Sequence, residues 1–146
     1  MIIIFTKQLQ PNTNRDIDFI IPLTAEQRNR SRQTIELSST QKIYLRLPRG
    51  TVLEDGDLLQ SETQENIAQI IVKPEPVITV KAKTELDLIR AAYHLGNRHV
   101  PLEITANYLR LSSDSVLESM LVKLGLEIIE EIAPFDPEKG AYGHHH

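Results

Sequence analysis

The chain has 146 residues, of which 40% are hydrophobic and 25% charged, which is the composition of an ordinary globular protein with one domain or two small ones. Twenty acidic against sixteen basic side chains leave a formal charge of −4, which argues against nucleic-acid binding, since phosphate neutralisation needs a basic excess. No segment approaches the roughly 18 consecutive apolar residues of a membrane span, and the apolar opening is too short for a signal peptide, so we expect a cytoplasmic protein.

The first half of the chain predicts β structure. Residues 42–47 alternate apolar Ile43 and Leu45 with polar positions, the period-two pattern of a half-buried strand. Residues 32–37 form a second expected strand, and the turn-forming residues 38–41 join it to residues 42–47 as a candidate hairpin. Strands are expected in five segments: residues 1–7, 32–37, 42–47, 58–60 and 66–72. These segments predict a small all-β domain, a sandwich or a roll.

One segment of this half has two interpretations. Residues 23–32, with Thr24 as a helix cap, fit a single helical turn. Three arginines within five residues (Arg28, Arg30 and Arg32) instead favour a solvated segment, which is the interpretation we prefer.

A domain boundary is expected at the two prolines Pro74 and Pro76. Proline restricts both itself and the residue before it to extended backbone, so the pair predicts a stiff connector. The composition also changes here, because residues 1–73 carry nine basic and nine acidic side chains, while all five histidines and the whole net negative charge lie in residues 74–146. We therefore expect a β-rich domain at 1–73 and a second domain at 74–146, with separate roles.

The second half alternates strands and helices. A β-branched strand is expected at 77–83, followed by a helix capped by Thr84, with Leu86, Ile89, Ala92 and Tyr93 at helical spacing and a left-handed stop at Gly96-Asn97. Two short extended segments follow at 100–106 and 107–111, then a helix between Asp114 and Gly125, and a last strand at 126–132. This βαββαβ order predicts an α+β ferredoxin-like domain. A domain of this size has a thin core and would gain from self-association.

The sequence gives little support for an enzyme. Cysteine is absent, so thiolate zinc sites and cysteine nucleophiles are excluded, and the chain has neither a Gly-x-Ser-x-Gly motif nor a phosphate-binding glycine loop. On a strand His99 and Glu103 would lie about 13 Å apart, too far for an acid–base pair. The expected strand at 107–111 has one aromatic residue, Tyr108, which argues against an RNA-recognition motif. We expect no catalytic residues and no cofactor other than a metal ion.

Two histidines lie near the end of the first expected helix of the second domain. His94 falls in the last turn, where an imidazole interacts favourably with the helix dipole. His99 follows the expected helix stop, where it is either a surface residue or a ligand presented outward. One imidazole is a weak metal site, but a two-fold dimer brings the same residue together from both protomers. Imidazole suits nickel, copper and zinc.

The chain ends in His144, His145 and His146, which are either the remnant of a purification tag or native ligands. From Ala133 to His144 an extended chain reaches up to roughly 36 Å. A native tail could therefore reach a metal site on its own domain and raise the local ligand concentration there.

The segment 92–102, which reads Ala-Tyr-His-Leu-Gly-Asn-Arg-His-Val-Pro-Leu, closely resembles the signature of the urease accessory protein UreE family, the nickel metallochaperones. Weaker matches follow in the family's order. They lie at residues 23–28, 31–33, 47–53, 55–57, 108–110, 116–118, 120–121, 124–125 and 134–142. The resemblance covers nearly the whole chain.

The resemblance implies a protein that delivers Ni²⁺ for assembly of the urease metallocentre, with Zn²⁺ or Cu²⁺ as ions that bind in vitro. It implies a homodimer through the second domain, with His99 of each protomer as an interfacial ligand and His144, His145 and His146 assisting. The implied partners are the urease apoprotein complex and the urease accessory GTPase, and the resemblance implies that the β-rich domain at 1–73 is the part that binds a partner or peptide. Some members carry histidines where this chain has Ser112, Ser113 and Ser115, so we expect that peripheral site to be absent. The alternative is a peptide-binding adaptor whose metal binding is incidental.

Overall fold

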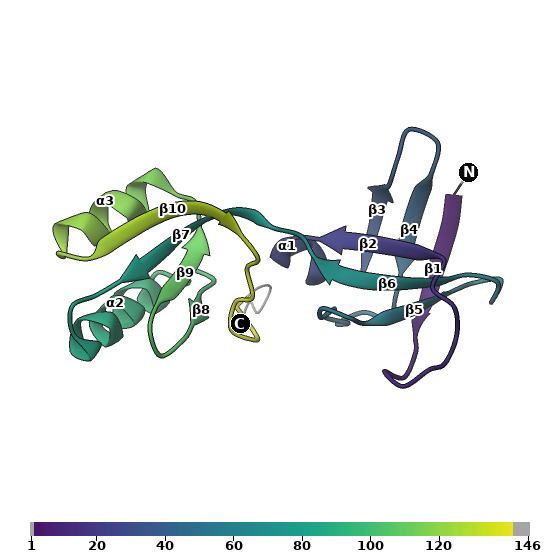
Figure 1. Cartoon of the computed structure of the whole chain (residues 1–146), viewed down its shortest axis with the longest axis horizontal. Helices are drawn as coiled ribbons and strands as arrows, with labels where there is room; N and C mark the ends of the chain where they lie inside the picture. Colours follow the sequence, from purple (N-terminus) through teal and green to yellow (C-terminus); the bar gives the residue numbers. More distant parts are fainter. Residues whose placement is uncertain (1, 142–146) are drawn as a thin grey trace. The chain divides into compact units, whose positions relative to one another are not determined.

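The computed structural model describes residues 2–141. It divides into two compact units, the first ending at Lys73 and the second beginning at Pro74 (Figure 1). No helix in the described residues is long and apolar enough to cross a membrane.

The first unit is built on a mixed six-stranded sheet in the order β2-β6-β5-β1-β4-β3. Parallel pairs join β1 to β4 and β2 to β6, and the other neighbours are antiparallel. The bounds of the strands are Ile2–Gln8 (β1), Phe19–Leu23 (β2), Arg32–Glu36 (β3), Lys42–Arg46 (β4), Leu58–Ser61 (β5) and Ile67–Val72 (β6). The expected β3–β4 hairpin is confirmed, with Ile35 paired to Ile43.

This sheet is curled. A flat sheet would hold β1 and β2, three strand spacings apart, about 14 Å from each other. Instead the rings of Phe5 on β1 and Phe19 on β2 lie edge to face, with centroids 6.4 Å apart. Buried residues of all six strands form one core around Phe5. The described part of this unit therefore has one rolled sheet rather than the two sheets of a sandwich.

The segment after β2 departs from the preferred expectation. Residues Ala25–Arg28 form the short helix α1, which Thr24 and Gln27 close with a reciprocal capping box. Arg28 is only 5% exposed and donates a hydrogen bond from Nη1 to the carbonyl of Leu23 at 2.8 Å. The expectation of a solvated segment is therefore wrong for Arg28, because the helical turn folds its guanidinium back onto the end of β2.

The strand β2 was not predicted. Its residue Pro22 has no N–H group and counts against a strand in the middle of a sheet. In the structure β2 lies at the edge of the sheet, next to β6 only, so the missing donor costs no hydrogen bond on the open side.

The second unit has a four-stranded antiparallel sheet in the order β10-β7-β9-β8 (Figure 1). Its strands are Glu75–Lys81 (β7), Glu103–Ile104 (β8), Leu109–Ser112 (β9) and Glu127–Ala133 (β10), and its helices are Glu85–Asn97 (α2) and Ser115–Lys123 (α3). The chain order β7-α2-β8-β9-α3-β10 is the split βαβ order expected from the sequence. The strand β7 begins at Glu75, so the proline connector is shorter than expected and Pro76 pairs with Ile132 inside the sheet.

Both helices pack on one face of this sheet. Ile78 and Val80 of β7 share a core with Leu88 of α2 and Leu121 of α3. Because successive side chains of a strand alternate between faces, Thr79 of β7 and Arg110 of β9 lie on the opposite face. That second face carries polar side chains.

Candidate metal centre

The end of α2 sets the position of His99. Both Gly96 and its neighbour Asn97 are helical, so the expected stop at these two residues is placed too early. The N–H of His99 donates to the carbonyl of Gly96 at 3.0 Å, and that of Val100 donates to Leu95 at 3.2 Å. This pair of bonds is a Schellman motif, in which His99 is the residue in the left-handed region, with φ of +57°.

The second helix of the unit, α3, ends in the same way but with a different residue. Gly125, with φ of +84°, donates to Val122 at 3.0 Å, and Leu126 donates to Leu121 at 3.2 Å. Glycine is the usual residue at this position because any side chain costs about 1 kcal/mol there. An imidazole thus occupies a site where glycine would fold more easily, and such a local cost points to a role for the side chain.

His99 and His94 differ in their exposure to solvent. His99 is exposed just beyond the helix. His94 is half-buried in the last turn of α2, its ring edge to face with Tyr93 and its carbonyl accepting a hydrogen bond from Arg98 at 3.0 Å. Within residues 2–141 no three His, Asp or Glu side chains gather closely enough to hold a metal ion. His144, His145 and His146 lie outside the described residues.

The chain after β10 returns toward the residues that follow His99. Phe135 is fully buried, and the N–H of Glu138 donates to the carbonyl of Leu102 at 2.8 Å. Leu102 lies three residues after His99. The segment from Pro134 to Glu138 therefore links β10, at one edge of the sheet, to the chain just before β8, at the other edge.

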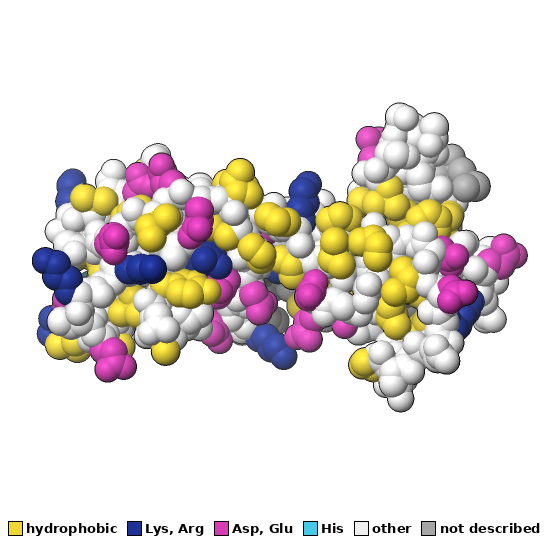
Figure 2. Space-filling model, in the orientation of Figure 1, with side chains coloured by type: hydrophobic (Ala, Val, Ile, Leu, Met, Phe, Trp, Pro, Cys, Tyr) yellow, Lys and Arg dark blue, Asp and Glu magenta, His cyan; other side chains and the backbone are white. Residues whose placement is uncertain are grey.

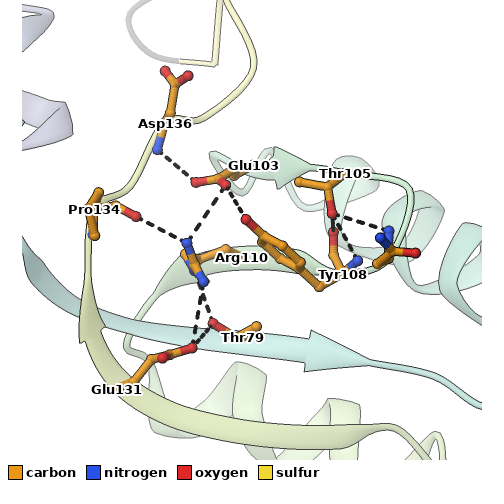
Figure 3. A network of polar contacts seen from close by, with 9 residues as sticks. Thr79, Glu103, Thr105, Tyr108, Arg110, Glu131, Pro134 and Asp136 are labelled. Atoms are coloured by element: carbon orange, nitrogen blue, oxygen red, sulfur yellow. Dashed lines mark hydrogen bonds and ion pairs between the residues drawn. The ribbon is translucent and has the colours of Figure 1, made fainter. Parts of the chain in front are cut away.

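A network of polar side chains contacts the segment that follows β10 (Figure 3). Arg110 donates to Thr79 Oγ1 at 3.0 Å and to the carbonyl of Pro134 at 3.2 Å. Its guanidinium forms ion pairs with Glu103 (3.8 Å) and Glu131 (3.6 Å) and lies 4.7 Å from the centre of the Tyr108 ring.

Glu103 connects this network to the returning chain. Its Oε1 accepts a hydrogen bond from the N–H of Asp136 at 2.9 Å, and its Oε2 accepts one from the Tyr108 hydroxyl at 3.1 Å. Burial and the bond to Glu103 raise the pKa of Tyr108, which keeps its hydroxyl protonated as the donor. Sequence reasoning missed this network, because its members come from four strands and meet only in the folded sheet.

Apolar side chains remain exposed on the helices of this unit. Of the expected α2 stripe, Ala92 packs against the core. Leu86, Ile89 and Tyr93 instead face away from it, with 53%, 63% and 65% of each residue exposed. The residues of α2 that pack on the sheet are instead Leu88 and the buried positions near it. Hydrophobic side chains are visible among the charged ones on the surface (Figure 2).

Both units match domains of one known protein family. The UreE urease accessory protein N-terminal domain matches residues 5–71, and the UreE C-terminal domain matches residues 75–146. The chain is 59% identical to the urease accessory protein UreE of a Nostoc species, over 97% of this chain and 96% of the relative. It is 52% identical to the protein of the same name from Microcystis aeruginosa, over 97% of this chain and 93% of that relative. The chain therefore belongs to the UreE family of urease accessory proteins, which act in urease maturation and are not enzymes.

Proposed function

We propose that this chain is a nickel chaperone that binds Ni²⁺ between two protomers and delivers it for assembly of the urease metallocentre. The observation that carries the proposal is His99, an exposed imidazole held in a left-handed backbone conformation at the end of α2. A rigid helix end presents the ring outward, as a shared ligand requires. Zn²⁺ and Cu²⁺ are expected to bind the same imidazoles in vitro.

Formation of a homodimer would strengthen this site in two ways. A single imidazole is a weak site, and two-fold symmetry doubles it without a second histidine in the chain. The stripe of Leu86, Ile89 and Tyr93 is an exposed apolar surface on α2, the helix that directly precedes His99. Burying such a stripe in a homodimer removes apolar area from water and brings the two helix ends into one assembly.

The tail histidines are proposed as the remaining ligands. The carbonyl of Leu102 accepts a hydrogen bond from Glu138, and Leu102 is the third residue after His99, at most about 11 Å away along an extended chain. The six residues from Glu138 to His144 span up to about 20 Å at 3.3 Å each. The chain length is therefore sufficient for His144, His145 and His146 to reach the His99 site.

The chemistry of these ligands suits delivery. Soft thiolates select copper(I) and zinc, and this chain contains no cysteine. Imidazoles supplied partly by a terminal segment leave a site from which a partner with its own ligands can take the metal. We propose that these partners are the urease apoprotein complex and the urease accessory GTPase in the cytoplasm, contacted through the β-rich domain at 1–73. The domain at 74–146 is proposed to bind the metal and to dimerise.

Nickel titration of matched histidine variants tests the proposal. His99→Gly removes the imidazole while suiting the backbone, and the control His94→Ala removes the imidazole in the last turn of α2. We expect His99→Gly to lose high-affinity nickel binding and His94→Ala to keep it. Unchanged tight binding by His99→Gly would refute the site. If His99→Gly loses nickel but activates urease normally in nickel-poor cells, the chain acts as an adaptor and not as a nickel chaperone.

A further inference from the structure

The strand β3 lies at an open edge of the first sheet (Figure 1). It is hydrogen-bonded to β4 alone, and no other described strand lies along its second side. The other outer strands of the two sheets are poor templates for an added strand, because β2 contains Pro22, β8 has two residues and β10 carries three glutamates. Among the described strands, β3 is therefore the edge best suited to pair with another chain.

The backbone groups that face this edge can be identified from the hairpin's hydrogen bonds. Its two ends are closed by bonds of 2.9 Å, from the N–H of Leu47 to the carbonyl of Ser31 and from that of Leu37 to Gln41. Bonded and non-bonded pairs alternate along an antiparallel ladder, so the residues of β3 that bond to β4 are its second and fourth. The residues whose N–H and C=O groups point to the open edge are Arg32, Thr34 and Glu36.

One of these three residues has an unmatched charge. Arg32 lies directly opposite Arg46 of β4, in a non-bonded pair, where facing side chains are closest and like charges are unfavourable. Arg46 forms an ion pair with Glu62 at 3.1 Å. Arg32 is exposed and has no ion pair or side-chain hydrogen bond within residues 2–141. An acidic group beside Arg32 would therefore relieve this repulsion.

The same face of the hairpin changes character along β3. Thr34 pairs with the half-buried Tyr44 of β4, which pairs in turn with the half-buried Ile4 of β1. At the far end Glu36 already has an ion pair with Lys42 at 3.6 Å. An added strand would thus meet an unpaired cation at one end of β3, an apolar row in the middle and a neutral pair at the other end.

We propose that an extended acidic segment of a partner protein binds the first unit as an added strand beside β3, with a carboxylate on Arg32. An antiparallel segment would place an apolar residue opposite Thr34 and an acidic residue opposite Arg32, two positions later. The backbone bonds supply affinity, and the planar guanidinium selects a carboxylate. This inference rests on the proposed function only for the partner contact through residues 1–73, and not for the nickel site.

A second copy of the chain fits this edge less well. Antiparallel pairing of β3 with itself, centred on Thr34, would set Arg32 opposite Glu36 of the other copy. That carboxylate is already shared with Lys42. A second two-fold interface, added to the proposed dimer, would also join dimers into open chains rather than a closed assembly. The observations therefore favour a different protein as the occupant.

Amide hydrogen exchange of the full chain tests the pairing directly. The probe is a short synthetic peptide that alternates valine and threonine and has one glutamate two positions after its central valine. A matched peptide has lysine in place of the glutamate. We expect the glutamate peptide to slow exchange at the N–H groups of Thr34 and Glu36 and to leave Gln33 and Ile35 unchanged, because these two already bond to β4. The lysine peptide should bind about fivefold more weakly.

Three variants separate the roles of charge and backbone. Arg32→Gln and its matched control Lys42→Gln each remove one cation from the same face of the hairpin. We expect Arg32→Gln to weaken binding of the glutamate peptide about threefold and Lys42→Gln to keep the parent affinity. Thr34→Pro removes the central outward N–H group and no β3–β4 bond, so it should weaken both peptides about tenfold or more. If Thr34→Pro fails to fold, the comparison of Arg32→Gln with Lys42→Gln remains the test.

Protection at another strand, equal binding of the two peptides, or undiminished binding by a folded Thr34→Pro would overturn the inference. No binding at all would also overturn it, because the charges of β3 would then only guard the edge against aggregation. Protection of the same N–H groups in the chain alone, rising with its concentration, would identify a second copy as the occupant and overturn it as well.

Nickel titration of the same proteins separates this inference from the proposed metal site. Thr34→Pro should bind nickel as the parent does, and His99→Gly should bind the glutamate peptide as the parent does. If His99→Gly loses nickel but no peptide protects β3, this inference fails and the nickel site stands. If the peptide protects β3 while His99→Gly keeps its nickel, the nickel site fails and the partner surface stands.

Discussion

At the scale of single residues, the ends of α2 and α3 make a natural comparison. Both helices close with the same pair of backbone bonds, but α3 has Gly125 at the left-handed position and α2 has His99. Histidine tolerates this region better than most residues, yet it remains less favourable than glycine. The imidazole is therefore retained at a small cost to stability.

This comparison gives a stability prediction. His99→Gly should be at least as stable as the parent protein and about 1 kcal/mol more stable than His99→Ala, because alanine is strained at positive φ. Gly125→Ala should be destabilised by a similar amount, as the matched change on α3. Urea unfolding measures all three. A less stable His99→Gly than His99→Ala would show that the backbone strain is absent.

A second residue pair governs part of the pH dependence of stability. A hydrogen bond with Glu130, burial and repulsion between the carboxylates raise the pKa of Glu118 on α3 from its ordinary value of 4.5. A raised folded-state pKa means that the folded protein holds this proton more tightly than the unfolded chain. The stabilising contribution is therefore full in acid and is lost as the pH rises through the folded-state pKa.

Glu118→Gln should remove this dependence, since an amide keeps a donor toward Glu130 at every pH. The variant should match the parent in acid and become progressively more stable than the parent as the pH rises toward neutrality. Chemical unfolding of the variant and the parent between pH 4 and 8 checks this prediction. A constant difference between Glu118→Gln and the parent at all pH values would contradict the pairing.

At the scale of elements, α2 has two apolar faces. Leu88, Ala91 and Leu95 pack on the sheet, whereas Leu86, Ile89 and Tyr93 are exposed. An amphipathic helix on a globular domain usually has one apolar face, so the second face is available for a partner. In the proposed assembly that partner is α2 of a second protomer.

If the proposed dimer forms through α2, Ile89→Glu should convert it to a monomer without unfolding it, because the new charge lies on the exposed face and would be buried in the interface. Val52→Glu, at an exposed apolar residue of the first unit, is the control and should remain dimeric. Sedimentation and circular dichroism together check this outcome. A dimeric Ile89→Glu would move the interface away from α2.

Local patterns predicted most elements of the chain. Alternation in residues 42–47 found β4, and the caps Thr84 and Asp114 found the starts of α2 and α3. Sequence patterns did not predict the features that depend on tertiary packing. Pro22 is tolerated in β2 only because that strand lies at an edge, and the exposed stripe of α2 has the same helical spacing as a core face.

The end of α2 shows a further limit of sequence reasoning. Gly96 is the usual signal for a left-handed stop, but the helix continues through it and closes at His99. Val100 explains the difference, since its N–H bonds to Leu95 and its side chain packs on the same core as Leu95. The apolar contact, and not the glycine, decides where the helix ends.

At the scale of the whole molecule, the candidate site depends on segments far apart in the sequence. His99 follows α2, while the returning chain reaches Leu102 and Glu103 from beyond β10. The histidine could be singled out from its motif. The path of the returning chain could not, because it depends on the Glu103 and Arg110 network that only the folded sheet assembles.

The metal-to-chain ratio, measured by native mass spectrometry on tag-free protein titrated with Ni²⁺, tests the shared site most directly. We predict a dimer that carries one tightly bound Ni²⁺ for two chains, and a His99→Gly dimer that carries none at the same metal concentration. A monomer that holds its own ion, or a His99→Gly dimer that retains the ion, would contradict the account.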